Sequence, residues 1–211
     1  GNQQFQSSQR REDFAVAFDE MMRIAVAEDV DAVVHAGDLF DHPQPRVEDI
    51  NRCVDAIQRL AAADIPFYGI VGNHERKLQA QWLDLIDRFD QVKRLSTDPL
   101  SVGDHTVFYG IDAIRGPQWE QHDFTLTPLD DGRQEIVVMH QLFEPLVDEI
   151  MADYSLEDVL ERLNITPDQI VVGDYHEYTE TTVEGVPALY PGSTERCSRT
   201  ERGPRGGVTF V

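Results

Sequence analysis

The chain reads Val33-Val34-His35-Ala36 and then Gly37-Asp38-Leu39-Phe40-Asp41, and a second stretch repeats the design as Phe67-Tyr68-Gly69-Ile70-Val71 and then Gly72-Asn73-His74-Glu75. In each stretch an apolar run ends in a glycine followed by a polar residue. A buried parallel strand that feeds a loop at its carboxyl end has this pattern. Because ligands bind at that edge of open α/β sheets, we expect Asp38, Asn73 and His74 to project into one crevice.

Two later apolar runs end in the same way. The run 136–139 ends at His140, and the run 170–173 ends in Asp174-Tyr175-His176. Each ending alone has an ordinary explanation as a turn, a helix cap or a structural histidine. Their recurrence at four strand ends favours a single site. Carboxylate and amide oxygens with imidazole nitrogens suit a divalent cation such as Mn²⁺.

These residues carry a resemblance to the calcineurin-like metallophosphoesterases. The branch that the chain resembles is the DNA double-strand-break repair nuclease called meiotic recombination eleven in eukaryotes and archaea, and SbcD in bacteria. The motifs that match the family are Gly37-Asp38-x-x-Asp41, Gly72-Asn73-His74-Glu75, His140 and Gly173-x-x-His176. The motifs that match the branch are Gly1 to Phe5, Arg10 to Phe14, Pro43 with Pro45, and Pro191 to Arg196.

The resemblance implies an α/β fold, a four-layer α-β-β-α sandwich of two mixed sheets flanked by helices, over residues 1–211. The family's opening signature, Asp-x-His-Leu-Gly, is not in the sequence. We therefore expect a nuclease core that lacks its first metal-binding motif. We also expect it to lack the carboxyl-terminal cap and the ATPase-binding segment of the branch.

The implied activity is that of a Mn²⁺-dependent DNA nuclease of a double-strand-break repair complex. It would hydrolyse phosphodiesters as a 3′–5′ exonuclease, a single-strand endonuclease or both, using a water activated by two divalent ions, Mn²⁺ or alternatively Mg²⁺. The alternative is a phosphodiesterase or phosphatase that acts on a small molecule. With one metal site short of two ligands, the chain is expected to bind one ion well and to be weakly active or inactive.

The resemblance also assigns roles to residues. Asp38 would bridge both ions, and His74 would stabilise phosphoryl oxygens or protonate the leaving group. The other metal ligands would be Asn73, His140 and Asp174 for one ion and His176 for the second. Residues that would support these ligands or contact substrate are Asp41, His42 and Arg196. The family usually has Gly-His-x-His where this chain has Gly173-Asp174-Tyr175-His176, and the added carboxylate favours harder ions.

The implied partners are DNA and a coiled-coil ABC-type ATPase of the SbcC or Rad-fifty type, reached through segments outside this chain. A homodimer would form through helices at 47–63 and 78–89, which could equally just cover the sheet. No apolar run approaches the ~20 residues of a membrane span. Only Cys53 and Cys197 are present, which favours a reducing cytoplasm and, by resemblance, association with the nucleoid.

The charge is unusual for a DNA-binding protein. The formal net charge is −21, and Lys77 and Lys93 are the only lysines. Phosphate backbones favour positive partners at ordinary salt. Dispersed acidic residues of this kind favour a protein from a cytoplasm of high salt, where charges are screened. The alternative is an acidic enzyme with a small or metal-bridged substrate.

Periodicity completes the expected chain of elements. Helices are expected at 8–28, 47–63, 78–89 and 154–163, the last capped by Ser155. Strands are expected at 29–36, 91–95, 100–102 and 106–111, with β-structure over 178–189 and a last strand at 207–211. His35 is expected to be a packed core histidine, and His122 a solvent-exposed one.

Overall fold

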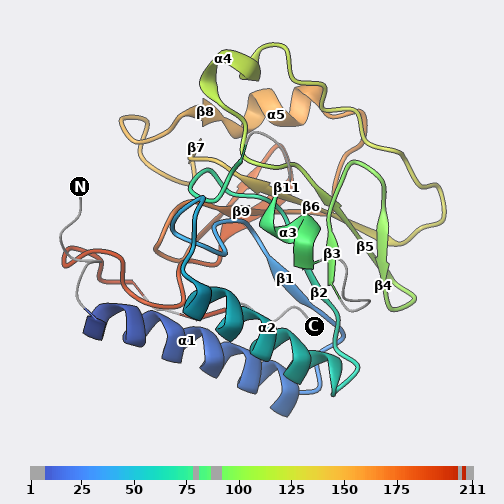
Figure 1. Ribbon diagram of the computed structural model, residues 1–211. Helices are drawn as coiled ribbons and strands as arrows, with labels where there is room; N and C mark the ends of the chain where they lie inside the picture. The colour runs from blue at the N-terminus through green and yellow to red at the C-terminus, as the bar shows by residue number, and fades with distance from the viewer. Residues whose placement is uncertain (1–7, 78–80, 87–91, 204–205, 208–211) are drawn as a thin grey trace.

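A computed structural model describes residues 8–77, 81–86, 92–203 and 206–207 of the chain. The helices surround two large sheets (Figure 1). They are α1 (Ser8–Ala27), α2 (Val47–Ala61), α3 (Trp82–Ile86), α4 (Gly116–Trp119) and α5 (Leu156–Arg162). The expected cap is present, because the Ser155 hydroxyl accepts a hydrogen bond from the Glu157 N–H at 3.2 Å.

The first sheet has three strands in the order β1-β2-β3, all parallel: β1 (Val33–His35), β2 (Phe67–Gly69) and β3 (Val92–Arg94). The second has six strands in the order β10-β11-β9-β6-β5-β4. Its strands are β4 (Leu100–Val102), β5 (Thr106–Gly110), β6 (Gln134–His140), β9 (Gln169–Gly173), β10 (Thr179–Val183) and β11 (Val186–Tyr190). A short parallel pair is formed by β7 (Phe143–Glu144) and β8 (Tyr154–Ser155).

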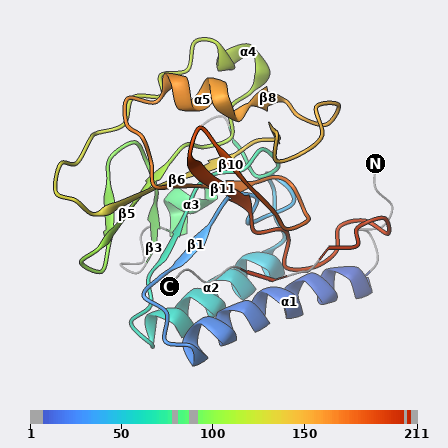
Figure 2. The same ribbon diagram turned by 180° about the vertical axis from the view of Figure 1, so that it is seen from behind.

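Three hydrophobic clusters separate four layers. One packs α1 and α2 on the first sheet, through residues such as Met22, Leu60 and Phe67. The second lies between the sheets and includes Ile70 and Val138. The third packs the second sheet under α4 and α5. Figures 1 and 2 show α1 and α2 side by side at one end of the molecule and α4 and α5 at the other.

Strand β6 is buried on both faces because each face packs against a different hydrophobic cluster. Ile136 and Val138 belong to the cluster between the sheets, whereas Val137 and Met139 belong to the outer cluster. Successive side chains of a strand point to opposite faces, so a strand covered on both faces must be apolar throughout. The apolar run therefore continues until His140, where the strand reaches the sheet edge.

The α/β sandwich class is confirmed, with differences in detail. The second sheet is mixed, but the described strands of the first are all parallel. The short helix α4 was not predicted, since Pro117 and the polar residues around it indicate a loop. Of the helix expected at 78–89, the described part is α3. The expected amino-terminal loop and most of the expected strand at 207–211 lie outside the described residues. No helix among those described is long and apolar enough to cross a membrane.

Candidate metal centre

The ends of three parallel strands bring Asp38, His140 and Asp174 together. Asp38 follows β1, His140 ends β6 and Asp174 follows β9. One ligand atom from each lies within 4.8 Å of the others. His140 Nε2 lies 3.4 Å from Asp38 Oδ2 and 3.7 Å from Asp174 Oδ1. The expected meeting of these side chains at one sheet edge is therefore present.

The backbone at both carboxylates adopts a conformation that such residues rarely take. The φ angle is 59° at Asp38 and 92° at Asp174. Positive φ costs a non-glycine residue about 1–3 kcal/mol and persists where the surrounding structure enforces it. Here the turn after each strand aims a carboxylate at the same point between the sheets.

Two glycines let the loops approach closely enough to form the site. A Cβ atom on Gly72 would lie 2.0 Å from Asp38 Oδ1, and one on Gly173 would lie 2.0 Å from the Ala36 carbonyl oxygen. No side chain fits at either position without moving a backbone segment of the site. Both glycines belong to the motifs that marked the strand ends in the sequence.

His140 is the most buried member of the group, with 1% of its side chain exposed. Its Nδ1 lies 2.7 Å from the Ala36 carbonyl oxygen. Its Nε2 is buried, has no well-aligned hydrogen-bond partner among the described residues, and faces the two carboxylates. A buried imidazole nitrogen without a partner, beside two carboxylates, fits a bound cation. Metal-binding histidines commonly donate their other ring nitrogen to a carbonyl in this way.

The pKa values of the group follow from burial and from the close charges. Burial would lower the pKa of His140, but hydrogen bonding and attraction from Asp38, with attraction from Asp174, raise it instead. Burial would raise the pKa of Asp38, yet interactions with His140 and His74 lower it. The pKa of Asp174 is raised, mainly by burial. A divalent ion among these residues would hold both carboxylates in their ionised form.

Asn73 and His74 meet the group in different ways. The Asn73 amide donates to Asp174 Oδ1 at 3.5 Å, so the side chain reaches the site. His74 reaches it through the backbone, since its N–H donates to Asp38 Oδ1 at 2.9 Å. The His74 ring faces away, with Nδ1 3.3 Å from an Asp41 carboxylate oxygen. Asn73 can thus serve as a ligand, whereas the His74 ring faces solvent beside Asp41.

Glu75 was given no role from the sequence, yet it holds the two loops of the site. Its side chain is buried, and its carboxylate accepts the N–H of Phe40 and the N–H of Gly72, each at 3.2 Å. Burial raises its pKa to about 7. Glu75 closes the motif Gly72-Asn73-His74-Glu75, and membership of that motif was the one signal in the sequence that could have identified it.

His176 is not part of the cluster formed by Asp38, His140 and Asp174. It is exposed, and its Nδ1 lies 3.0 Å from Glu201 Oε1. His42 is also exposed and accepts the Gln44 N–H at 3.0 Å within its own loop. Arg196 is exposed as well, and its carbonyl accepts a hydrogen bond from the Arg10 guanidinium.

Two other histidines can now be placed. His35 is packed as expected, 6.0 Å from the Phe67 ring, and burial lowers its pKa to about 4. The expectation for His122 is wrong. Its Nε2 is buried without a hydrogen-bond partner among the described residues, and its ring stands edge-on to Phe124 at 4.8 Å.

Comparison with known proteins identifies relatives over almost the whole chain. The calcineurin-like phosphoesterase family matches residues 9–178. The DNA double-strand break repair protein Mre11 of Methanosarcina acetivorans is 43% identical over 97% of this chain and 34% of its own length. The Mre11 proteins of Haloferax volcanii and Halobacterium salinarum are 41% and 40% identical over 98% of this chain, and over 46% and 52% of their own lengths.

The chain thus spans between about a third and about a half of these curated relatives. A solved crystal structure aligns with it over 86% of both chains, with a TM-score of 0.57 and 10% sequence identity. At that identity the likeness concerns the fold alone, and it agrees with the layered sandwich.

Proposed function

Because the chain belongs to the calcineurin-like phosphoesterase family, we propose that it is the nuclease core of a DNA double-strand-break repair protein and hydrolyses phosphodiester bonds with divalent ions. The observation that supports this most is the buried His140 Nε2, which faces Asp38 and Asp174 without a well-aligned hydrogen-bond partner among the described residues. Relatives named as double-strand break repair proteins match 97% or more of the chain. The chemistry of the metal-binding residues and the similarity to repair proteins therefore both favour phosphodiester hydrolysis.

The ligand set favours Mn²⁺, with Mg²⁺ as the second candidate. Asp38, Asn73, His140 and Asp174 offer oxygen atoms and one imidazole nitrogen, a set that suits hard or borderline divalent ions. A pair of bound ions would lower the pKa of a coordinated water and neutralise charge on the phosphate. By resemblance Asp38 would be shared between the ions, and the second would use His176 together with residues outside this chain.

His74 is proposed to act on the phosphate directly. Its backbone is fixed by Asp38, whereas 53% of its side chain is exposed. An imidazole can donate hydrogen bonds and transfer a proton, so it can stabilise phosphoryl oxygens or give a proton to the leaving oxygen. Asp41 lies beside Nδ1 and would orient the ring. Arg196 is proposed to contact substrate, whereas His42, which faces its own loop, is the weaker candidate.

The net charge of −21 supports a second candidate, hydrolysis of a small phosphoester. One assay distinguishes the DNA nuclease from the hydrolase of a small phosphoester. The chain and the full-length gene product are each incubated with Mn²⁺. The substrates are end-labelled single- and double-stranded DNA and bis-p-nitrophenyl phosphate. DNA cleavage that needs Mn²⁺ supports the nuclease, and the labelled products distinguish exonuclease from endonuclease action. Hydrolysis of the small ester without DNA cleavage by the full-length protein supports the alternative.

The partners proposed are DNA, a coiled-coil ABC-type ATPase of the SbcC or Rad-fifty type bound through segments not in this chain, and a second copy of the chain. The residues 47–63 and 78–89 remain the proposed pairing surface. In the described part of it, the apolar side chains of Val47 and Leu85 are 68% and 45% exposed. The buried face of α2 covers the first sheet instead. Light scattering of the parent and a Leu85→Glu variant tests this pairing.

A further inference from the structure

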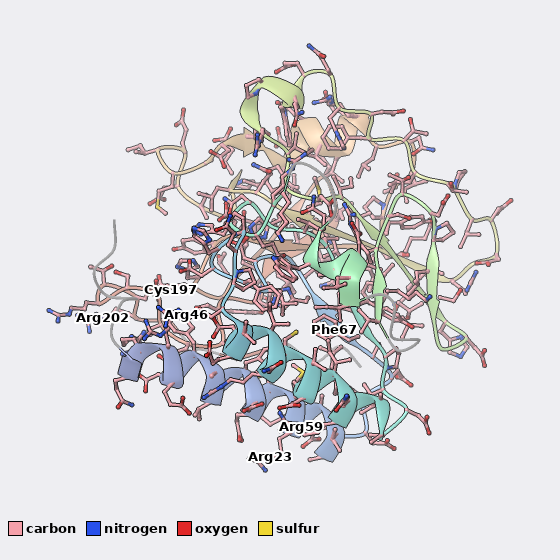
Figure 3. All side chains as sticks on the ribbon, viewed as in Figure 1. Arg23, Arg46, Arg59, Phe67, Cys197 and Arg202 are labelled. Carbon is pink, nitrogen blue, oxygen red and sulfur yellow. The ribbon has the colours of Figure 1, made fainter. Side chains whose placement is uncertain are left out.

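The loop at residues 71–76, the β2 loop, is held by a segment of the other sheet. It follows β2 of the first sheet, and Figure 3 shows Phe67, the first residue of β2, on the side of that sheet which α2 covers. Residues 112–114, the β5 segment, follow β5 of the second sheet. The Ala113 N–H of this segment donates to the Val71 carbonyl oxygen at 2.9 Å. The start of the β2 loop is therefore joined to the second sheet.

Asp112 adds a side-chain contact at the same point of the β2 loop. Its Oδ1 accepts the Val71 N–H at 2.8 Å. Val71 is only 1% exposed, and a buried N–H group without a hydrogen-bond partner costs free energy. The Asp112 carboxylate supplies that partner directly before Gly72, where the loop passes against Asp38.

Arg94 of β3 holds the Asp112 carboxylate in turn. Its guanidinium donates to Asp112 Oδ2 and, at 2.7 Å, to Asp84 Oδ1 in α3. The Arg94 side chain is 32% exposed and the Asp112 side chain 26%, so the pair is partly shielded from solvent. Charge-assisted hydrogen bonds are stronger than neutral ones, and a guanidinium holds its partners in a fixed geometry. One oxygen of Asp112 is thus fixed by Arg94 while the other holds the loop.

The β5 segment also contacts the far end of the β2 loop and the end of β6. The Arg76 guanidinium donates to the Ala113 carbonyl oxygen. Gln141, which follows His140, is buried, and its Oε1 accepts the Ile114 N–H at 2.7 Å. The β5 segment therefore links the loop of the first sheet to the strand end of the second sheet that supplies the buried imidazole.

We propose that Asp112 is a positioning residue of the candidate metal centre and that Arg94 holds it in place. By fixing the backbone two residues before Asn73, Asp112 sets where the Asn73 side chain and the His74 N–H meet the other residues of the centre. Residues that orient a metal ligand commonly change metal affinity about 10- to 100-fold when they are replaced. The inference rests on the proposed metal-dependent function, and it assigns no contact between Asp112 and the ion or the substrate.

The test is a calorimetric titration of the full chain with Mn²⁺, for the parent and for variants at Asp112. Asp112→Ala removes the acceptor of the Val71 N–H, whereas Asp112→Asn keeps a side-chain oxygen there. Asp168→Ala is the matched control, because Asp168 Oδ2 accepts the Glu135 N–H at the same distance, 2.8 Å, at the opposite end of β6 from His140. Asp112→Leu, which fills the space without an acceptor, replaces the alanine variant if that variant does not fold.

Asp112→Ala should lower Mn²⁺ affinity about tenfold or more, whereas Asp112→Asn and Asp168→Ala should stay close to the parent. A double-mutant cycle with Asn73→Ala separates positioning from a general loss of stability. Because one ligand that Asp112 positions is then already missing, Asp112→Ala should cost less affinity in the Asn73→Ala background than in the parent. Melting temperatures establish that each variant is folded during the titration.

Three results would overturn the positioning role while Mn²⁺ binding by the parent still supports the proposed function. They are unchanged Mn²⁺ affinity in a folded Asp112→Ala variant, an equal loss of affinity in Asp112→Asn or Asp168→Ala, and an equal loss from Asp112→Ala with and without Asn73. A parent that binds no Mn²⁺ would contradict the proposed function and, with it, the positioning role.

Discussion

The Nδ1 atom of His140 lies 2.7 Å from the carbonyl oxygen of Ala36, so the end of the first sheet orients a ring that the second sheet supplies. A carbonyl oxygen only accepts hydrogen bonds, which places a proton on Nδ1. Nε2 is then the atom aimed at Asp38 and Asp174. The packing of two sheets thus determines which imidazole nitrogen is available to a metal ion.

The close approach of Gly72 to Asp38 predicts that Gly72→Ala weakens metal binding. The new Cβ would lie 2.0 Å from Asp38 Oδ1, so the carboxylate or the loop must move. We expect Mn²⁺ affinity to fall about tenfold or more, which corresponds to about 1.4 kcal/mol. Gly116→Ala is the control, because its Cβ would meet only the Tyr154 hydroxyl, at 3.6 Å. Calorimetric titration of both variants that shows equal affinities would contradict this role.

The position of the His74 ring predicts that replacing it lowers turnover without weakening metal binding. A His74→Ala change should leave Mn²⁺ affinity near the parent value, because only the backbone of His74 contacts Asp38. Turnover of the full-length protein should fall about 10²- to 10⁴-fold, as for loss of a general acid. His105→Ala, in the exposed turn before β5, serves as the control and should keep its activity. Loss of Mn²⁺ binding in the His74 variant would show that its ring is a ligand after all.

Strand ends were predictable from the sequence because buried parallel strands are apolar throughout and stop abruptly. This placed Asp38, Asn73, His140 and Asp174 at one edge, where the structure has them. The position of His176 was not predictable in the same way. It depends on Glu201, which is 25 residues away and meets it through a loop without periodicity.

The sequence did not predict the helix α4 and gave a wrong expectation for His122, and the two errors have a related cause. Trp119 is 3% exposed and stacks on Tyr154 with ring centroids 3.6 Å apart. That packing buries Trp119 in a segment whose other residues are mostly exposed, and Arg162 of α5 donates to the His122 carbonyl oxygen at 2.9 Å. The pattern of neighbouring residues in the sequence cannot show that a distant part of the chain packs against them.

Burial of His122 predicts a loss of stability on the acid side. Burial lowers its pKa in the folded chain, so the folded state keeps the ring neutral while the unfolded chain takes up a proton near pH 6.5. The neutral ring's contribution to the free energy of unfolding is complete above that pH and declines as the pH falls below it. Replacing His122 with Gln should flatten the fall in the free energy of unfolding between pH 7 and pH 5.

Urea unfolding of the parent and the variant at each pH measures this difference. His105→Gln, in an exposed turn, is the control and should follow the parent curve. If His122→Gln and His105→Gln lose stability equally as the pH falls, His122 is not the titrating group.

The charge of −21 predicts an unusual dependence on salt. Self-repulsion destabilises the folded chain unless it is screened, and the Debye length shrinks to ~3 Å at 1 M salt. The melting temperature should therefore rise from dilute buffer to molar KCl. DNA affinity with Mn²⁺ fixed should hold or increase before it falls, since screening removes repulsion before it weakens phosphate contacts.

Calorimetric melting and a DNA-binding titration against KCl measure the two effects. A melting temperature that does not change with salt, together with affinity that declines from the lowest salt onward, would rule out adaptation to high salt.

Asp38, with His140 and Asp174, is proposed to hold a divalent ion. Mn²⁺ titration of the chain, followed by electron paramagnetic resonance of the free ion, tests it with Asp38→Asn and with Asp41→Asn as the charge-matched control. The side chain of Asp41 is 71% exposed and pairs with His74 instead of facing His140. We predict that the parent and Asp41→Asn bind Mn²⁺ with similar affinity, whereas Asp38→Asn loses about tenfold or more. Equal Mn²⁺ affinity in the two variants, or no Mn²⁺ binding by the parent, would contradict the proposal that Asp38 is a ligand.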